Sequence, residues 1–223
     1  MFYSGAVPDY AFDDLDPEEI DRLAGIYRPL TEAVRGLVDA TIRTTVEPAE
    51  IEAVQAEVEA LTTRLRASQM DGSFGVRFSR GRGRAWGNTV VGLRNACDPP
   101  VLVERHPSGD GRVWADFHLG AAYEGPPGLV HGGVSSMILD QMLGEAAGAG
   151  GKPGMTGTLT VTYRQATPLG DLRAEAWIDR SEGIKTWAKG HLIGAEGVTV
   201  EAEGVFILPK WAREGNQRPS SFE

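Results

Sequence analysis

One segment, residues 132–147, places the strongest constraint on how this chain can fold. Its apolar side chains go most of the way round a helix, at Val134, Met137, Ile138, Leu139, Met142 and Leu143, with small residues between them. A helix that is apolar on nearly all sides is buried on nearly all sides. The sequence therefore predicts an interior helix around which the other elements are wrapped.

Extended segments supply the wrapping. Residues 112–119 alternate apolar and polar side chains, which predicts a strand, and two shorter segments before them are candidate strands. Short turns connect the segments after the helix, so we expect hairpins and an antiparallel meander there. The sequence thus predicts an α+β fold in which an antiparallel sheet surrounds the helix. The shorter candidates are residues 89–94 and 101–104, and the later segments are residues 156–164, 171–180, 185–194 and 197–208.

The first 70 residues differ from the rest in charge and pattern. They hold 14 acidic and 6 basic residues, against 17 and 16 in residues 71–223. Asp16 followed by Pro17 and two glutamates predicts a helix start, and Pro29 should kink or split that helix near Arg28. We predict an acidic helical extension over residues 1–70 and a main domain over residues 71–223.

A second helix of the extension begins at Pro48 and carries one narrow apolar seam. The seam has heptad-like spacing, at Ile51, Val54, Val58, Leu61 and Leu65. A seam this narrow does not stabilise an isolated helix. The second helix is therefore expected to pack on the first helix, on the main domain or on a partner chain.

Composition excludes several classes of protein. The formal net charge of −9 argues against nucleic acid as a partner, and a single cysteine, Cys97, rules out an internal disulfide framework. No apolar run is long enough to cross a bilayer, and the acidic N-terminus is unlike a signal peptide. These features predict a cytoplasmic protein without membrane insertion.

Several motifs of catalysis and cofactor binding are missing from the sequence. There is no phosphate-binding loop, no dinucleotide fingerprint after a strand and no Gly-x-Ser-x-Gly nucleophile elbow. No pair of histidines has metal-ligand spacing. We expect neither a metal nor a cofactor.

The interior helix carries one carboxylate, Asp140, and begins at His131-Gly132-Gly133. A buried carboxylate is costly unless it is compensated, whereas free N–H groups at a helix start stabilise an oxyanion. Together they suit an acyl-transfer hydrolase in which Asp140 attacks a carbonyl or activates water. Seven residues of helix separate Gly133 from Asp140 by roughly 10 Å, which indicates that Asp140 serves the helix start of a second subunit.

These residues, together with the run from Thr156 to Tyr163 and Pro168, resemble the hotdog-fold acyl-CoA thioesterases of the PaaI/4-hydroxybenzoyl-CoA type. The subgroup containing the human thioesterase superfamily members is the most similar. The resemblance covers residues 85–210 and leaves the extension outside. It implies a helix wrapped by a five- or six-stranded antiparallel sheet, dimers joined edge to edge and active sites at the dimer interface.

The resemblance also implies roles for individual residues. Asp140 would be the nucleophile or general base, and the Gly132 and Gly133 amides would polarise the thioester carbonyl. Thr156 occupies the position of a serine or threonine that places the attacking water. His131 belongs to the same motif and is a candidate catalytic residue as a general base, and alternatively it is a loop and helix-start residue.

One departure from the family and several structural alternatives remain open. Some relatives have an asparagine six residues before the histidine, where this chain has Gly125 with Glu124 beside it. Asp140 is alternatively a helix residue bonded to Ser136 one turn back, and Thr156 alternatively only begins a strand. Glu124 is open to a structural or a functional interpretation.

Arginines are the candidates for holding the phosphates of coenzyme A, because guanidinium groups match phosphate geometry. A basic run contains Arg82 and Arg84 between glycines, and Arg164 ends a predicted strand. A solvated loop is the alternative explanation for the run.

The sequence therefore predicts a homodimeric acyl-CoA thioesterase, with a dimer of dimers also open. Its substrate would be an acyl-CoA, hydrolysed to a free acid and coenzyme A. Two alternatives share the fold: a non-catalytic module that binds acyl-CoA, and a hydratase acting on enoyl-CoA.

Overall fold

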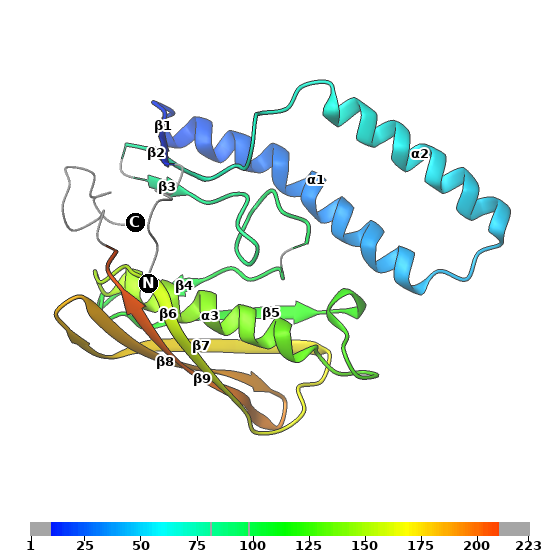
Figure 1. Ribbon diagram of the computed structural model, residues 1–223. Coiled ribbons are helices and arrows are strands. Elements are labelled where there is room, and N and C mark those ends of the chain that lie inside the picture. Colours follow the sequence, from blue (N-terminus) through cyan, green and yellow to red (C-terminus); the bar gives the residue numbers. More distant parts are fainter. Residues whose placement is uncertain (1–9, 81, 98, 210–223) are drawn as a thin grey trace.

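The computed structural model describes residues 10–80, 82–97 and 99–209. A curved sheet lies beneath the central helix α3, and the long helices α1 and α2 lie on the other side of α3 (Figure 1). The helices are α1 (Pro17–Arg43), α2 (Pro48–Arg66) and α3 (Gly132–Ala149), with a 3-10 turn η1 (Ala121–Tyr123). The strands of the large sheet are β4 (Glu104–Arg105), β5 (Val113–Leu119), β6 (Met155–Tyr163), β7 (Gly170–Glu182), β8 (Lys185–Gly194) and β9 (Gly197–Ile207).

The large sheet has six strands in the order β4-β5-β7-β8-β9-β6, and all neighbours are antiparallel. The predicted meander is confirmed for β7, β8 and β9. The expected hairpin between β6 and β7 is wrong, because β5 occupies the edge of β7 that such a hairpin needs. Strand β6 instead pairs with β9 and becomes an edge of the sheet.

Helix α3 packs along the concave face of this sheet and supplies much of the core. Seven of its residues are buried, including Leu139, Met142 and Leu143 with no exposed surface. The core is completed by apolar side chains from β5, β7, β8 and β9. The predicted α+β architecture, a helix wrapped by an antiparallel sheet, is confirmed as a hotdog fold with an N-terminal helical region.

Residues 76–105 contain less of the main sheet than predicted. The expected strand over residues 89–94 is a series of turns, and of residues 101–104 only Glu104 joins a strand, β4. A small separate sheet forms from β1 (Tyr10–Phe12), β2 (Val76–Ser79) and β3 (Arg82–Arg84). Since β1 pairs in parallel with β2, residues 10–12 of the extension are hydrogen-bonded to residues beyond the predicted boundary at 71. The division into two domains stays a prediction.

Helix α1 begins where the sequence predicts and continues further than expected. The Asp16 side chain accepts a hydrogen bond from the Glu19 N–H at 2.8 Å, which caps the helix. The helix then runs through Pro29 to Arg43, so the expected split near Arg28 is wrong. A proline removes one backbone hydrogen bond from a helix. The helical segments on either side of Pro29 keep their own backbone hydrogen bonds, so the helix continues through it.

Helix α2 also begins at Pro48 as predicted, but it buries none of its residues. Four of its five seam residues are more than a third exposed. In the described chain the seam therefore does not pack on α1 or on the main domain, as two of the three sequence alternatives expected. In the described parts of the chain, no helix is long and apolar enough to cross a membrane.

Beside the small sheet lies a partly buried ion pair, Arg84–Asp13, whose removal has a predictable effect. Arg84 is 6% exposed, donates to Asp13 and to the Ser79 hydroxyl, and lies over the Trp86 ring. We expect Arg84→Met to lower the free energy of unfolding by about 2 kcal/mol, because breaking a buried pair leaves Asp13 without its counter-charge. The measurement is denaturant unfolding at pH 7.

The same pair predicts a pH dependence. Partial burial tends to raise the pKa of Asp13, but hydrogen bonds from Ser79 and Arg84 outweigh it and leave that pKa below its usual value. A depressed carboxyl pKa contributes stability above the unfolded value of about 4 and loses it as the pH falls further. The difference in Tm between wild type and Arg84→Met should therefore shrink below pH 4. A difference that stays constant down to pH 3 would contradict this assignment.

Candidate functional site

The carboxylate of α3 and the hydroxyl of β6 meet in the folded chain. The Thr156 Oγ1 donates to the Asp140 Oδ1 at 2.9 Å. Asp140 is half-buried and Thr156 is exposed, so the pair lies at the surface rather than in a closed interior. The sequence predicts a buried carboxylate, whereas in the single chain Asp140 is only half-buried, because among the described residues no strand covers α3 beyond the edge strand β6.

A β-bulge aims Thr156 at the helix. Strand β6 directs Leu159 and Val161 toward the core, and simple alternation would place residue 157 on the same face. The register between β6 and β9 shifts between Thr156 and Thr158, so Thr156 reaches Asp140 instead. The residue within the shift is Gly157, where a Cβ would lie 2.7 Å from the Ile207 side chain. Bulges often re-aim a side chain in this way next to active sites.

The start of α3 is capped by its own histidine. His131 is the N-cap residue, and its Nδ1 accepts a hydrogen bond from the Gly133 N–H at 3.0 Å. None of the described residues accepts a hydrogen bond from the Gly132 N–H. In this structure the two amides of the predicted oxyanion site therefore differ, with one bound to an imidazole nitrogen and one open.

Sequence reasoning missed a tyrosine at this helix start. The Tyr163 hydroxyl donates to the Gly132 carbonyl oxygen at 2.8 Å and lies 2.7 Å from the Ser136 hydroxyl. Ser136 also donates to the Gly132 carbonyl, at 3.0 Å. Asp140 thus receives its hydrogen bond from Thr156, and the alternative in which Ser136 holds the carboxylate is not what the structure shows. The sequence offered one indication of this contact, the predicted strand from Thr156 to Tyr163. The two ends of this strand, β6, both contact α3 in the structure.

The loop before α3 explains the departure at Gly125. A Cβ at this position would lie 2.7 Å from the His131 Cα, so a side chain does not fit without moving the backbone. Glu124 accepts a hydrogen bond from the Gly128 N–H at 2.7 Å and closes the loop. This contact favours the structural interpretation of Glu124.

The three candidate phosphate ligands are not brought together at the Asp140 site by any contact in the described chain. Arg84 is buried and paired with Asp13, and Arg164 donates twice to Glu201, at 2.7 and 2.9 Å. A phosphate would have to displace a carboxylate from either guanidinium. The Arg82 side chain lies outside the described residues. A coenzyme A-binding role for these arginines stays a prediction.

The site opens along the free edge of β6. Among the described strands it pairs with β9 alone, so within residues 10–209 as described its other edge carries unpaired backbone groups. Met155 and Tyr163, at its two ends, are 37% and 54% exposed. An exposed edge strand is a template for pairing with another chain.

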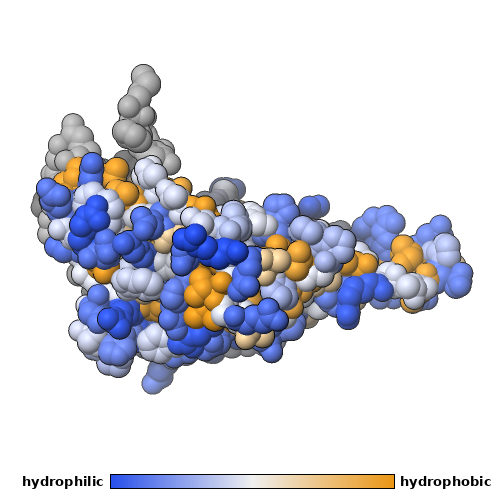
Figure 2. Space-filling view, turned by 90° about the horizontal axis from the view of Figure 1, so that it is seen from below, coloured by the Kyte–Doolittle hydropathy of each residue, from blue (hydrophilic) through white to orange (hydrophobic). Residues whose placement is uncertain are grey.

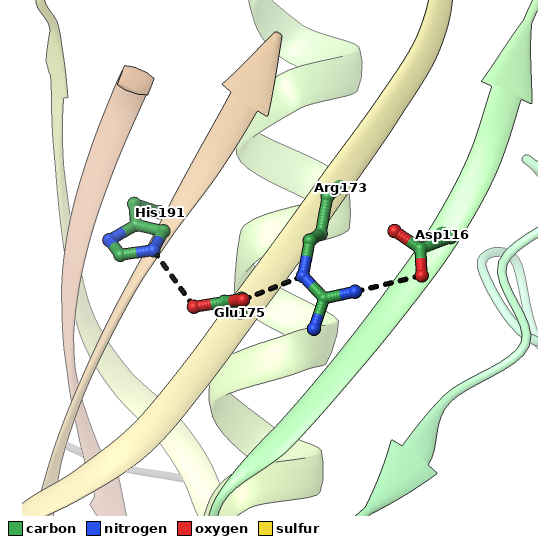
Figure 3. Close-up of polar contacts among 4 residues, drawn as sticks. All are labelled: Asp116, Arg173, Glu175 and His191. Atoms are coloured by element: carbon green, nitrogen blue, oxygen red, sulfur yellow. Dashed lines mark hydrogen bonds and ion pairs between the residues drawn. The ribbon is translucent and has the colours of Figure 1, made fainter. Parts of the chain in front are cut away.

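A second polar cluster lies on the outer face of the sheet, with α3 behind it (Figure 3). Arg173 donates to Glu175 at 2.6 Å and to Asp116 at 2.8 Å, and His191 lies 3.3 Å from Glu175. The hydrogen bond from Arg173 holds the pKa of Glu175 below its usual value against partial burial, with His191 adding to the effect. The same bond raises the pKa of Arg173. These contacts between side chains of neighbouring strands tie β5, β7 and β8 together.

Two cavities lie away from Asp140. One of about 430 Å³ is on the outer face of the sheet, between Arg164, Trp177 and Lys189, and one of about 240 Å³ lies between α1 and the loop that follows Trp86. Within the described ranges, no group of three or more His, Cys, Asp or Glu side chains is arranged to hold a metal ion. The groups described at the Asp140 site are its carboxylate and the Thr156 hydroxyl, with the start of α3 lying earlier on the same helix.

Several solved structures of thioesterases match about half of this chain. Zebrafish thioesterase superfamily member 2 is 20% identical with a TM-score of 0.44, over 48% of this chain and 81% of that one. A hypothetical thioesterase protein from Streptococcus pneumoniae TIGR4, solved with coenzyme A, is 19% identical with a TM-score of 0.45, over 49% and 85%. No protein-family model matches the chain.

One further crystal structure is much more similar. It is of a thioesterase superfamily protein that is 35% identical, with a TM-score of 0.73, over 81% of this chain and 94% of that one. Residues 71–223 are only 153 of the 223 residues, so this match has to include part of the helical extension. On the basis of this identity over almost the whole length of the relative, the chain belongs to the thioesterase superfamily.

Proposed function

We propose that this protein is an acyl-CoA thioesterase that releases a free acid and coenzyme A. The observation that carries the proposal is the hydrogen bond from Thr156 to Asp140 beside an open strand edge. A carboxylate held in one orientation and accessible from solvent is suited to activate water or to attack a carbonyl itself.

A second copy of the chain would complete the site. Within one chain the Gly133 amide and Asp140 are separated by seven helical residues, roughly 10 Å, which is too far for both to act on one carbonyl group. Pairing of two β6 edges around a two-fold axis would bring Asp140 of one subunit toward the helix start of the other. We therefore propose a homodimer with two equivalent sites at its interface.

The proposed reaction needs few groups. Asp140 takes a proton from water, the water oxygen attacks the thioester carbonyl carbon, and the tetrahedral oxyanion is stabilised by amides at the start of α3. The carbon–sulfur bond then breaks, and the thiolate of coenzyme A leaves and is protonated. Direct attack by Asp140 would instead give a mixed anhydride, which water hydrolyses to the same products.

The two amides of the helix start would contribute differently. The Gly132 N–H is open in the structure, whereas a carbonyl oxygen at Gly133 has to replace the His131 nitrogen. Proposed contacts to phosphate from Arg82, Arg84 or Arg164 would lie outside this reacting centre.

The test is release of free thiol from a panel of acyl-CoAs that differ in chain length and aromatic character. Cys97 is an exposed thiol, so the protein is assayed as a Cys97→Ser variant to lower the background signal. Sustained turnover on at least one substrate supports the proposal. Binding of acyl-CoA without any turnover would replace it with the non-catalytic module, and a hydroxylated product from enoyl-CoA would replace it with a hydratase.

Thr156 is proposed as a positioning residue, and its hydroxyl should be separable from its shape. Thr156→Val keeps the volume but removes the donor to Asp140, so we expect kcat to fall about tenfold, the equivalent of one hydrogen bond to a charged group. Thr156→Ser keeps the donor and should retain most of the activity. Equal losses in the two variants would mean that shape, not the hydrogen bond, matters at this position.

A further inference from the structure

Helix α2 presents an apolar seam that nothing in the described chain covers. No residue of α2 is buried, and the seam residue Val58 is only half-buried. The exposed fractions of the other seam residues are 43% for Ile51, 38% for Val54, 51% for Leu61 and 57% for Leu65. A row of exposed apolar side chains of this kind on a folded domain marks an interaction surface.

Apolar side chains are also exposed on the distal half of α1 and in the loop after it. Val38 and Ile42 of α1 and Val46 of the loop are 38%, 52% and 49% exposed. Together with α2 they form a projecting helical hairpin, residues 38–66, which we call the arm. Figure 2 shows the arm extending from the body of the molecule, with hydrophobic side chains among charged ones. The arm therefore offers two helices with exposed apolar faces to a partner.

We propose that the arm docks on the arm of a second copy of this chain, with the two α2 helices antiparallel and the distal halves of α1 beside them. The three- and four-residue spacing of the α2 seam is the spacing with which helices pack as coiled coils. The hairpin supplies two helices and a second hairpin supplies two more, which is the composition of a four-helix bundle.

The distribution of charge identifies the partner and its direction. The acidic residues of α2 come first and its arginines last, at Glu50, Glu52, Glu57 and Glu59 and then Arg64 and Arg66. An antiparallel pair places the acidic part of each helix beside the basic end of the other, whereas a parallel pair places acid beside acid. The same arrangement also opposes the two helix dipoles.

One antiparallel register suits both the apolar seam and the charged residues that flank it on one side. Antiparallel packing of Val58 against Leu61 of the other copy also brings Val54 against Leu65. Glu57 and Arg64 each directly precede a seam residue on the same flank, and this register places Glu57 of one helix beside Arg64 of the other, twice by symmetry. No like-charged pair arises on this flank. The surface is thus complementary to itself, and the inference does not depend on the proposed thioesterase activity.

Charge reversal in the full-length protein tests the pairing. We expect Glu57→Arg and Arg64→Glu each to raise the Kd for self-association at least tenfold, as measured by sedimentation velocity. The double variant restores the opposite charges, so its Kd should return close to the wild-type value. Glu52→Arg is the matched control, because it makes the same charge change off the flank, and it should stay near wild type. Helicity by circular dichroism confirms that the variants fold.

A second measurement detects the contact even if the β6 edges also pair. Val58→Cys and Leu61→Cys are made separately in a Cys97→Ser background. A mixture of the two should form a disulfide-linked species of twice the chain mass, and neither variant alone should do so, because like positions lie offset along the antiparallel helices. Lack of this mixed species, or an unchanged Kd in both single charge variants, would overturn the proposal.

Discussion

Asp140→Asn should reduce kcat for thiol release about 10³-fold or more, the range expected when a general base or nucleophile is lost. The asparagine has nearly the same shape, and its carbonyl oxygen still accepts the hydrogen bond from Thr156. The variant therefore removes the charge and the proton-accepting capacity with little change in structure. Thermal unfolding of the variant should remain close to that of wild type, which separates a catalytic loss from a folding defect.

Glu145→Gln is the matched control for this variant. Glu145 lies on the same helix, five residues further along, and its carboxylate contacts Gln141 and Arg105 rather than Thr156. The same carboxylate-to-amide change at this position should leave thiol release within about twofold of wild type. Activity of Asp140→Asn at the level of Glu145→Gln would remove Asp140 from the mechanism.

The largest effect on stability is expected from truncation of the central helix. Leu143 has no exposed surface and packs close to Gly204 of β9, where a Cβ on the glycine would lie 3.3 Å from the leucine Cδ1. We expect Leu143→Ala to lower the free energy of unfolding by about 3 kcal/mol, from lost transfer energy and from the cavity left behind. In a chain of this size that corresponds to a fall in Tm of about 9 °C, which calorimetry can measure.

Leu102→Ala provides the comparison, because Leu102 is 65% exposed. The chemical change is identical, but little surface is buried, so the effect should be within about 0.5 kcal/mol. Equal destabilisation by the two variants would mean that α3 is not the centre of the core.

Much of the fold was predictable from periodicity. The apolar helix around Leu139 and the alternating strand that ends at Leu119 carry local patterns that one element alone can display. The cap at Asp16 and the helix start at Pro48 were predictable for the same reason, since capping depends on a few neighbouring residues. Pro29 shows the limit of such rules, because it was expected to kink or split α1 and the helix is not split there.

The pairing of strands was not predictable from the turns. A short connection suggested that β6 and β7 form a hairpin, yet each pairs with a strand distant in sequence, β9 and β5. Which edges are available depends on all strands at once. The exposure of the α2 seam was likewise not predictable from the sequence, because only the folded chain shows that neither α1 nor the main sheet buries it.

The sequence alone determined the chemical groups of the candidate site: a carboxylate at Asp140, a hydroxyl at Thr156 and a glycine-rich helix start at His131. These are local properties, set by residue type and spacing along one helix. The tertiary structure decided that Thr156 reaches Asp140, that His131 caps the Gly133 amide and that Tyr163 holds the Gly132 carbonyl. Those contacts depend on a bulge and on the edge position of β6, which arise from strand pairing across the whole sheet and leave no signature in any short stretch of the chain.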